Sequence, residues 1–368
     1  MSFITHILTA LLLGYLSFTT TLANYILTSF HIEETATETA PQNESSLSYL
    51  PSLFSQAHIP DVLLQSSAYQ AAAVANSDSI AWKTTTDPMN AIVNIYCTSI
   101  TSKQIRTTTG SGFFVHPSGV IMTNAHVAQF LLLERTGAFG DTSCIIRTGN
   151  PAAPRYTAEL LYIPPAWVEV NAKVIGDKAP TGTGERDYAL LYVTSSIDES
   201  PLPASFPALA IDSTPLTKRV TNTPVVAAGY PAGALLRGGS DTDLLPREAT
   251  TSISDLYTFT TNHADVIALR GSTMGEQGAS GGPVVNTNGA VIGMITTRGN
   301  DTTDGVGSLR AITMTHINNT ITEETGVSLR TNLASDVPKR ATIFTSTMAP
   351  FLTSRLVNAL GSSTNPTH

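Results

Sequence analysis

Short runs in which hydrophobic and polar residues alternate recur through the middle of this chain, and they predict β-strands. Two clear examples are residues 91–97 (AIVNIYC) and 110–116 (GSGFFVH). Further runs of this kind lie at 121–127, 143–147, 158–163, 187–193, 224–231, 251–260, 266–270, 284–285, 291–296 and 308–312. Turn-forming residues separate them, as at 117–119 (PSG) and 286–289 (NTNG). Many short strands joined by polar turns predict an all-β fold of two β-barrels and argue against an α/β sheet.

Before the first strand, the pattern predicts an N-terminal apolar helix and then a linker. Residues 3–30 carry no formal charge, and their centre, 7–16, is strongly apolar. A membrane-spanning helix needs about 20 mostly apolar residues, so this stretch is long enough. We expect residues 1–30 to be either a cleaved signal peptide, with a small-residue site at 21–23, or a retained transmembrane signal anchor, which the length favours. Residues 31–87 are interpreted as a linker that contains a short helix at 61–75.

After the last strand, the pattern predicts C-terminal helices. One is expected from Thr313 to about Glu324, ending near Gly326, because glycine is the usual residue just past a helix. A second is expected over 350–360 within the extension 326–368. The segment 149–185 is rich in Gly, Pro and Thr, and we interpret it as including surface loop insertions.

The composition fits a folded, β-rich protein. Hydrophobic residues make up 42% of the 368, which is ample for a core, and charged residues only 13%, well below the usual ~25%. Thr, Ser, Asn and Gly fill the polar positions, as in many β-rich proteins outside the cytoplasm. The net charge is −8 and no basic patch is present, so nucleic acid is not an expected partner.

Candidate chemistry is concentrated in three motifs. Residues 278–284 (GASGGPV) place Ser280 in a glycine-rich turn. In such a turn the amides of Gly278 and Ser280 can point into one small space, which is the geometry of an oxyanion hole. Upstream, 121–127 (IMTNAHV) places His126 at the end of a strand, and 186–193 (RDYALLYV) places Asp187 at the start of another. A serine, a base and an orienting acid are the parts of a nucleophilic triad.

The order His126, Asp187, Ser280 resembles that of a trypsin-like serine peptidase of the chymotrypsin fold. The resemblance covers about 91–320 and is nearer to the bacterial HtrA-type branch than to digestive trypsins. It implies a peptidase domain over 88–325, built as two six-stranded antiparallel β-barrels with the site between them. It also implies that His126 is the base, that Asp187 orients it, and that the amides of Gly278 and Ser280 form the oxyanion hole. Too few residues follow Thr313 for the expected helix plus the PDZ domain that HtrA proteins carry.

Two departures from the family pattern bear on activation and specificity. Ala279 stands where many trypsin-like zymogens have the aspartate that receives a new N-terminus, so that switch is not expected here. Met274 stands at the position of the acidic specificity residue, with Thr296, Thr297 and Arg298 along the wall. We therefore expect a small or medium apolar residue before the scissile bond. The alternative, an acidic residue recognised by Arg298, remains open.

The remaining reactive side chains give weaker signals. Cys97 and Cys144 both lie on predicted strands, and either a disulfide in an oxidising compartment or two buried free thiols is compatible with their spacing. No spacing typical of a metal site is present, and no metal or cofactor is expected. His116, His263 and His316 are scattered and are expected to be structural or exposed.

The sequence thus predicts a serine endopeptidase that acts on proteins or peptides outside the cytoplasm, secreted or held to a membrane by its N-terminal segment. Two alternatives remain: an esterase that uses the same triad, and an idle, protease-like binding or chaperone module. The sequence leaves the oligomeric state open.

Overall fold

The computed structural model describes residues 47–49, 62–75, 82–102, 104–134, 136–137, 139–176, 184–233, 243–259, 263–299 and 306–363. The apolar segment 1–30 and most of the predicted linker lie outside these ranges, so the signal peptide or anchor stays a prediction. Within the described ranges, no helix combines the length and the apolar character needed to cross a membrane.

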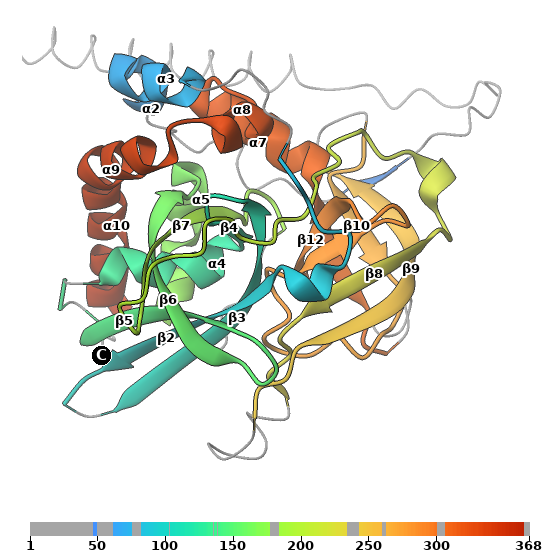
Figure 1. The fold of residues 1–368 in the computed structure, drawn as a ribbon, viewed down its shortest axis with the longest axis horizontal. Coiled ribbons are helices and arrows are strands. Elements are labelled where there is room, and N and C mark those ends of the chain that lie inside the picture. Colours follow the sequence, from blue (N-terminus) through green and yellow to red (C-terminus); the bar gives the residue numbers. More distant parts are fainter. Residues whose placement is uncertain are drawn as a thin grey trace, which may run out of the picture. The chain divides into compact units, whose positions relative to one another are not determined.

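The first β-barrel is closed by six antiparallel strands in the order β2-β3-β4-β7-β6-β5. It forms the teal and green part of Figure 1. Its strands are β2 (Ile92–Ile100), β3 (Ile105–His116), β4 (Val120–Thr123), β5 (Asp141–Thr148), β6 (Ala153–Tyr162) and β7 (Ala189–Ser196).

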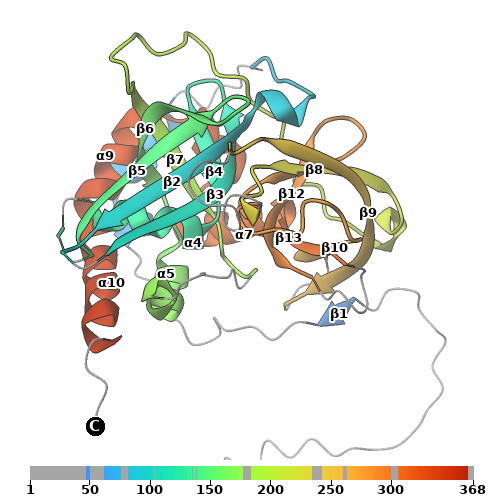
Figure 2. The same cartoon turned by 90° about the horizontal axis from the view of Figure 1, so that it is seen from below.

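The second barrel follows in the chain and lies beside the first, in yellow and orange (Figures 1 and 2). Six antiparallel strands run in the order β9-β10-β13-β12-β11-β8, and β8 pairs with β9 to close the ring. They are β8 (Pro224–Gly229), β9 (Arg247–Thr258), β10 (Val266–Leu269), β11 (Pro283–Val285), β12 (Val291–Arg298) and β13 (Leu309–Thr313). A short parallel strand, β1 (Ser48–Tyr49), is added to the end of β9. The two six-stranded barrels expected from the sequence are therefore confirmed.

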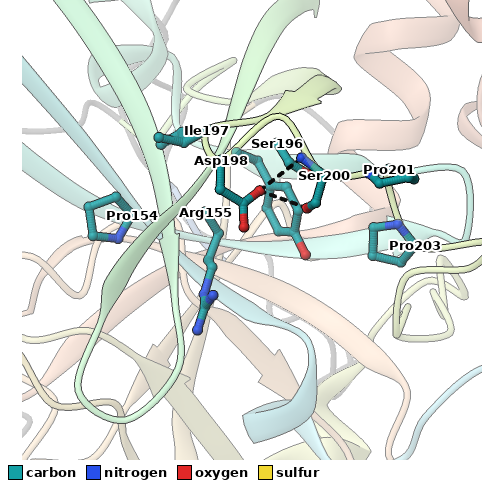
Figure 3. A pocket seen from close by; sticks show the side chains of 9 residues that line it. Pro154, Arg155, Ser196, Ile197, Asp198, Ser200, Pro201 and Pro203 are labelled. Carbon is teal, nitrogen blue, oxygen red and sulfur yellow. Dashed lines mark hydrogen bonds between the residues drawn. The ribbon is translucent and has the colours of Figure 1, made fainter.

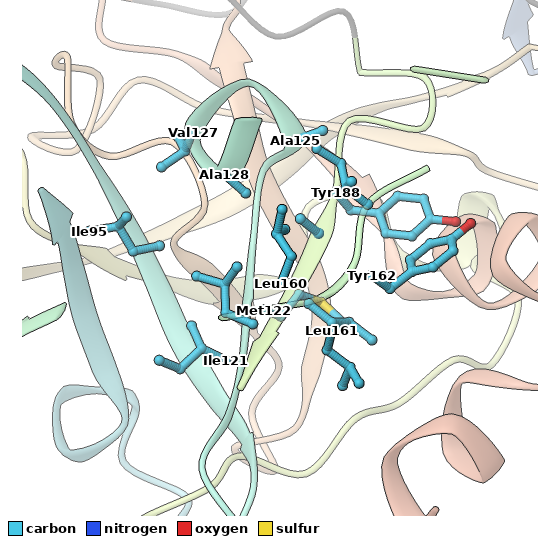
Figure 4. Packing of buried hydrophobic residues seen from close by; sticks show 14 of the residues in the cluster. Ile95, Ile121, Met122, Ala125, Val127, Ala128, Leu160, Leu161, Tyr162 and Tyr188 are labelled. Carbon is cyan, nitrogen blue, oxygen red and sulfur yellow. The ribbon is translucent and has the colours of Figure 1, made fainter. Parts of the chain in front are cut away.

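Buried hydrophobic side chains fill the first barrel and explain why the alternating runs became strands. Burial alternates along β5, as expected for a strand with one face toward a core, whereas β4 is buried at all four positions. Ile95, Ile121 and Leu161 come from three different strands and are 0% exposed, and Figure 4 shows their neighbourhood. The core thus joins strands that are far apart in the sequence.

Two local predictions of chain reversal and termination are also confirmed. The turn at 286–289 is closed by a hydrogen bond from Gly289 N to Asn286 O, and Asn286 N donates to Ala290 O. Helix α7 (Met314–Thr325) follows β13 directly, and the Thr313 side chain caps it by accepting from His316 N. It ends at Gly326, whose φ of +78° is a conformation that favours glycine.

The helices differ from the prediction in number and extent. The helix predicted at 61–75 is two helices, α2 (Val62–Gln65) and α3 (Ser67–Val74), because Ser66 ends the first and caps the second by accepting from Tyr69 N. The C-terminal extension forms three helices instead of one: α8 (Leu329–Ala334), α9 (Val337–Thr347) and α10 (Ala349–Ser363). Figure 1 shows the red helices α9 and α10 against the first barrel. The contact is direct, since the rings of Phe344 and Tyr162 are 6.0 Å apart.

The segment 149–185, interpreted as including surface loop insertions, contains the strand predicted at 158–163 and a helix that was not predicted. Strand β6 occupies Ala153–Tyr162 and helix α5 occupies Pro165–Asn171. A proline in the first turn suits a helix start because its missing N–H would have no partner there. Trp167 on this helix is 0% exposed, so α5 is part of the core and not a surface insertion.

Cys97 and Cys144 form a disulfide, which decides between the two alternatives left by the sequence. The two residues are directly opposite each other on β2 and β5, the pair of strands that completes the first ring. Both side chains are buried. The disulfide therefore links two residues that are 47 positions apart in the sequence, on the two strands whose pairing closes the barrel.

Candidate active site

His126 and Asp187, 61 residues apart in the sequence, are joined by two hydrogen bonds. His126 Nδ1 lies 2.7 Å from Asp187 Oδ2, and the His126 main-chain N–H donates to Asp187 Oδ1 at 2.9 Å. His126 is 4% exposed and Asp187 0%. His126 lies on the short helix α4 (Ala125–Ala128), which begins right after strand β4. One carboxylate thus fixes both the ring and the backbone of the histidine.

The backbone around Asp187 is held from two sides. Asn124 Nδ2 donates to the main-chain oxygen of Asp187 at 2.8 Å. Arg186, immediately before the aspartate, has φ +57°, an uncommon conformation for a residue other than glycine. Its guanidinium pairs with Glu324 at 2.5 Å and with Glu323 at 3.1 Å, both on α7. Helix α7 therefore anchors the segment that carries Asp187.

Ser280 lies in the loop between β10 and β11. Hydrogen bonds to carbonyl oxygens of this loop fix its backbone. Gln277 O accepts from Ala232 N at 2.6 Å, and Ala279 O accepts from Gly282 N at 3.0 Å. In a trans peptide the N–H points opposite to the C=O. These two bonds therefore orient the amides of Gly278 and Ser280, which belong to the same peptide planes.

The amides of Gly278 and Ser280 are the ones predicted to bind an oxyanion. Gly278 has φ +94° and is buried. In the described part of the chain, neither of these two amides donates a hydrogen bond, whereas those of Ala279, Gly281 and Gly282 all do. A buried N–H without a partner is rare in folded proteins. The buried amide of Gly278 and the amide of the half-buried Ser280, beside a serine hydroxyl, suit a ligand that carries a negatively charged oxygen.

The Ser280 hydroxyl does not contact His126 in this structure. Its Oγ donates to Thr296 O on β12 over a long 3.4 Å. Catalytic hydrogen bonds are often long or misaligned in free enzymes and shorten when substrate binds.

The loop of Ser280 nevertheless abuts the strands that lead to His126. Ser111 N on β3 donates to Ser280 O at 2.7 Å. Gly281 has φ +87°, and a Cβ there would collide with Ser111 O and with Thr123 Oγ1 at the end of β4. The site is therefore at the junction of the barrels, as the resemblance implied.

Sequence reasoning missed Ser111 as part of this site. The signal was a small polar residue inside an otherwise apolar strand, GSGFFV at 110–115. Ser111 is 0% exposed, and its partners are more than a hundred residues away in the sequence. A strand pattern gives the face on which a residue lies but not which distant loop meets it.

The four candidate specificity residues have different surroundings. Met274 is 0% exposed within the core of the second barrel, with its methyl group toward Gly229. Thr296 is buried, and its hydroxyl donates to Met294 O at 3.2 Å. Thr297 is half-buried and Arg298 exposed. Of the four, only the last two present side chains to solvent.

A pocket of about 250 Å³ lies elsewhere, on the outside of the first barrel (Figure 3). In this pocket, Asp198 Oδ1 accepts from the backbone N–H and from the hydroxyl of Ser200. None of the predicted site residues lines it. The described residues also contain no group of three or more His, Cys, Asp or Glu side chains arranged to hold a metal ion.

Comparison with known proteins gives one family match. The family model "Trypsin-like peptidase domain" matches residues 110–294, which include His126, Asp187 and Ser280. Among curated proteins, none matches the chain.

Solved structures of the Rv3671c protease from M. tuberculosis are similar to this chain at low identity. The active form is 17% identical, with coverage of 82% of this chain and 99% of that one and a TM-score of 0.39. An inactive form is 20% identical, with coverage of 64% and 89% and a TM-score of 0.38. At these TM-scores the likeness adds nothing to what the strand order already defines.

Proposed function

Since this chain belongs to the trypsin-like peptidase family, we propose that it is a serine endopeptidase with the triad His126, Asp187 and Ser280. Ser280 Oγ attacks the peptide carbonyl carbon while His126 Nε2 takes its proton. The resulting oxyanion is bound by the amides of Gly278 and Ser280. His126 then protonates the leaving amine as the C–N bond breaks, and a water molecule, activated in the same way, releases the acyl group.

The observation that carries this proposal is the bidentate contact between Asp187 and His126. With Nδ1–H held by the carboxylate, the imidazole presents its other nitrogen, Nε2, as the proton acceptor. A buried carboxylate that has no basic group beside it is costly. In the proposed mechanism, the Asp187 carboxylate stabilises the positive charge that the His126 ring carries during the reaction.

We also propose that the enzyme is nearer to the HtrA-type branch than to digestive trypsins. Ala279, next to the nucleophile, is 1% exposed and has no carboxylate for a new N-terminus. Met274 offers no charge to a Lys or Arg side chain of the substrate. A small or medium apolar residue before the scissile bond is the preference we propose.

Action outside the cytoplasm is part of the same proposal. Disulfides form and persist in oxidising compartments and are rare in the cytosol. The bond between Cys97 and Cys144 supports an extracytoplasmic site of action, whether the protein is secreted or tethered through residues 1–30.

The test of the proposed reaction is cleavage of casein, followed by mass spectrometry of the products, for the wild type and Ser280→Ala. We expect cleavage by the wild type and a loss of at least about 10³-fold in the variant. Hydrolysis of short acyl esters without cleavage of casein would favour the esterase alternative. A folded wild type that acts on neither would favour an idle binding module.

A further inference from the structure

Ser111 connects the first barrel to the loop of the nucleophile through several buried hydrogen bonds. Its hydroxyl donates to Gly278 O at 2.7 Å and accepts from Tyr230 N at 2.8 Å. Its backbone N–H donates to Ser280 O, also at 2.7 Å. Its own carbonyl accepts from the Thr123 hydroxyl at the end of β4, at 2.7 Å. Ser111 is therefore bonded at its hydroxyl, its amide and its carbonyl.

These bonds fall on successive peptide planes of the loop. The plane between residues 277 and 278 is held by Ala232 N, and that between 279 and 280 by Gly282 N. Ser111 holds the two that alternate with them: the plane of 278–279 through its hydroxyl, and that of 280–281 through its amide. The latter plane is also held at Gly281 N, which donates to Ile295 O.

The Ser111 side chain has its largest effect on the orientation of the peptide plane of 278–279. This plane lies between the two planes that present the unpaired amides of Gly278 and Ser280, so its orientation sets the angle between these donors. Its other bond within the protein, from Ala279 N to Glu276 O, is a longer 3.3 Å. Glycine adopts positive and negative φ about equally well, so Gly278 by itself does not fix this plane.

We propose that Ser111 is a positioning residue that holds the oxyanion hole in its binding geometry from the opposite barrel. The inference rests on the proposed peptidase function and deepens it. Donors that are already aimed at the developing charge need no reorganisation during the reaction. Loss of the hydroxyl frees the carbonyl of Gly278 and leaves the amide of Tyr230 unpaired, while the triad side chains stay untouched.

The surroundings are shaped for a serine at this position. A Cβ on Gly229 would come within 2.7 Å of Ser111 Oγ. The hydroxyl is thus enclosed by a glycine, a backbone amide and a backbone carbonyl, which leaves it one donor and one acceptor partner. Both partners of the Ser111 hydroxyl, Gly278 O and Tyr230 N, belong to the second half of the chain, so this side chain forms a specific link and does more than fill space.

The test compares Ser111→Ala with Ser99→Ala. Ser99 is a suitable control because it is also a buried serine of the first barrel, on β2, and its hydroxyl bonds only to that of Thr142. The readouts are kcat and KM on a peptide containing the first casein bond that the wild type cleaves, the second-order rate of labelling by a fluorophosphonate, and the thermal midpoint. For Ser111→Ala we expect kcat and labelling to fall by about 10- to 100-fold with KM changed less than about twofold.

Ser99→Ala is expected to lower the midpoint and leave kcat unchanged. If both variants lose stability and neither loses kcat, Ser111 is only structural and the inference is overturned. Should Ser111→Ala not fold, Ser111→Cys keeps a weaker donor of similar size, and its labelling rate is expected to lie well below that of the wild type. An unchanged rate in that variant would overturn the inference. A wild type that neither cleaves nor labels would overturn the proposed function, and this inference with it.

Discussion

At the residue scale, the proposed function depends on a histidine whose orientation is set by one carboxylate. Asp187 accepts from both the ring and the backbone of His126, and it is fully buried. Such an arrangement selects the tautomer with the proton on Nδ1. In the proposed mechanism, Asp187 orients the imidazole and stabilises its charge, and His126 transfers the proton.

Replacing the carboxylate by an amide tests this assignment. In Asp187→Asn the amide group can donate to Nδ1 and so favour the wrong tautomer, and we expect kcat to fall by about 10⁴-fold in a folded protein. The measurement is kcat on the same casein-derived peptide, with Asp212→Asn as control, since the Asp212 carboxylate accepts from Thr214 N and lies outside the site. Equal activity of the two variants would contradict the role of Asp187.

The residues of this site were predictable to different degrees. His126, Asp187 and Ser280 could be proposed from the sequence because their motifs are local and their order is specific. Ser111 was not found, since its importance comes from a contact with Gly278, 167 residues away. A long-range hydrogen bond produces no periodic pattern in a sequence. The residues that hold the site in place are therefore less predictable than its reactive groups.

At the element scale, helix α7 is bonded to the segment that carries Asp187. Glu324 pairs with Arg186, next to Asp187, and also accepts from the hydroxyl of Tyr162 on β6. Its side chain is only 1% exposed. Burial raises the pKa of Glu324, and the Arg186 guanidinium opposes that rise.

Removal of the buried charge is expected to destabilise the fold. In Glu324→Gln the Arg186 guanidinium, 13% exposed, loses its closest carboxylate, and breaking one side of a buried pair costs about 3 kcal/mol. Glu323→Gln is the matched control, because Glu323 contacts the same guanidinium but is 62% exposed, so a change of less than about 1 kcal/mol is expected. Urea unfolding measures both free energies. Equal values for the two variants would show that the contact of Glu324 does not stabilise the fold.

A second buried acid, Asp265, makes the stability of α7 dependent on pH. Asp265 Oδ1 lies 2.9 Å from His316 Nδ1 and 3.7 Å from His263 Nε2, and Oδ2 accepts from Thr258 and Phe259 N. Burial alone would raise its pKa, but the hydrogen bond and charge of His316 outweigh burial and lower the pKa to about 2 from 3.8. His263 and His316 were expected to be structural or exposed, and His316 is indeed buried.

Because the folded pKa lies below the unfolded one, this carboxylate stabilises the fold above about pH 4 and loses that contribution as the pH falls toward 2. The contribution is roughly 2 kcal/mol or less, from a difference of just under two pKa units. We expect urea unfolding between pH 6 and pH 2 to show a decline that is smaller in Asp265→Asn. The same decline in both proteins would contradict the assignment.

At the scale of the whole molecule, the barrels were predictable and the helical layer only in part: α7 and α10 match predicted helices, whereas α8 and α9 were missed. Strands such as β5 have a clear alternation, and turns such as 286–289 have the residues that such turns require. The helices of the extension have weaker signals: α9 carries few hydrophobic residues, and its burial depends on Phe344 packing against Tyr162 of the first barrel. Tertiary contacts stabilise such helices, and a single sequence does not show these contacts.

The helical layer also joins the two ends of the described chain. Arg340 on α9 is fully buried, donates to the hydroxyl of Tyr69 on α3, and lies 4.9 Å above its ring. Gln70, on the same helix, donates to Thr325 O, next to Glu324. A continuous set of contacts thus leads from α3 through α7 to the segment of Asp187, so the peptidase barrels and the flanking helices act as one folded unit.

The central claim is that Ser280 is a nucleophile activated by His126 at the junction of the barrels. The most direct measurement is reaction of the folded protein with a fluorophosphonate, followed by peptide mapping of the modified residue. We expect one label per chain on Ser280, none in Ser280→Ala, and labelling slowed by several orders of magnitude in His126→Ala. A folded wild type that stays unlabelled, or one labelled at another residue, would contradict the account.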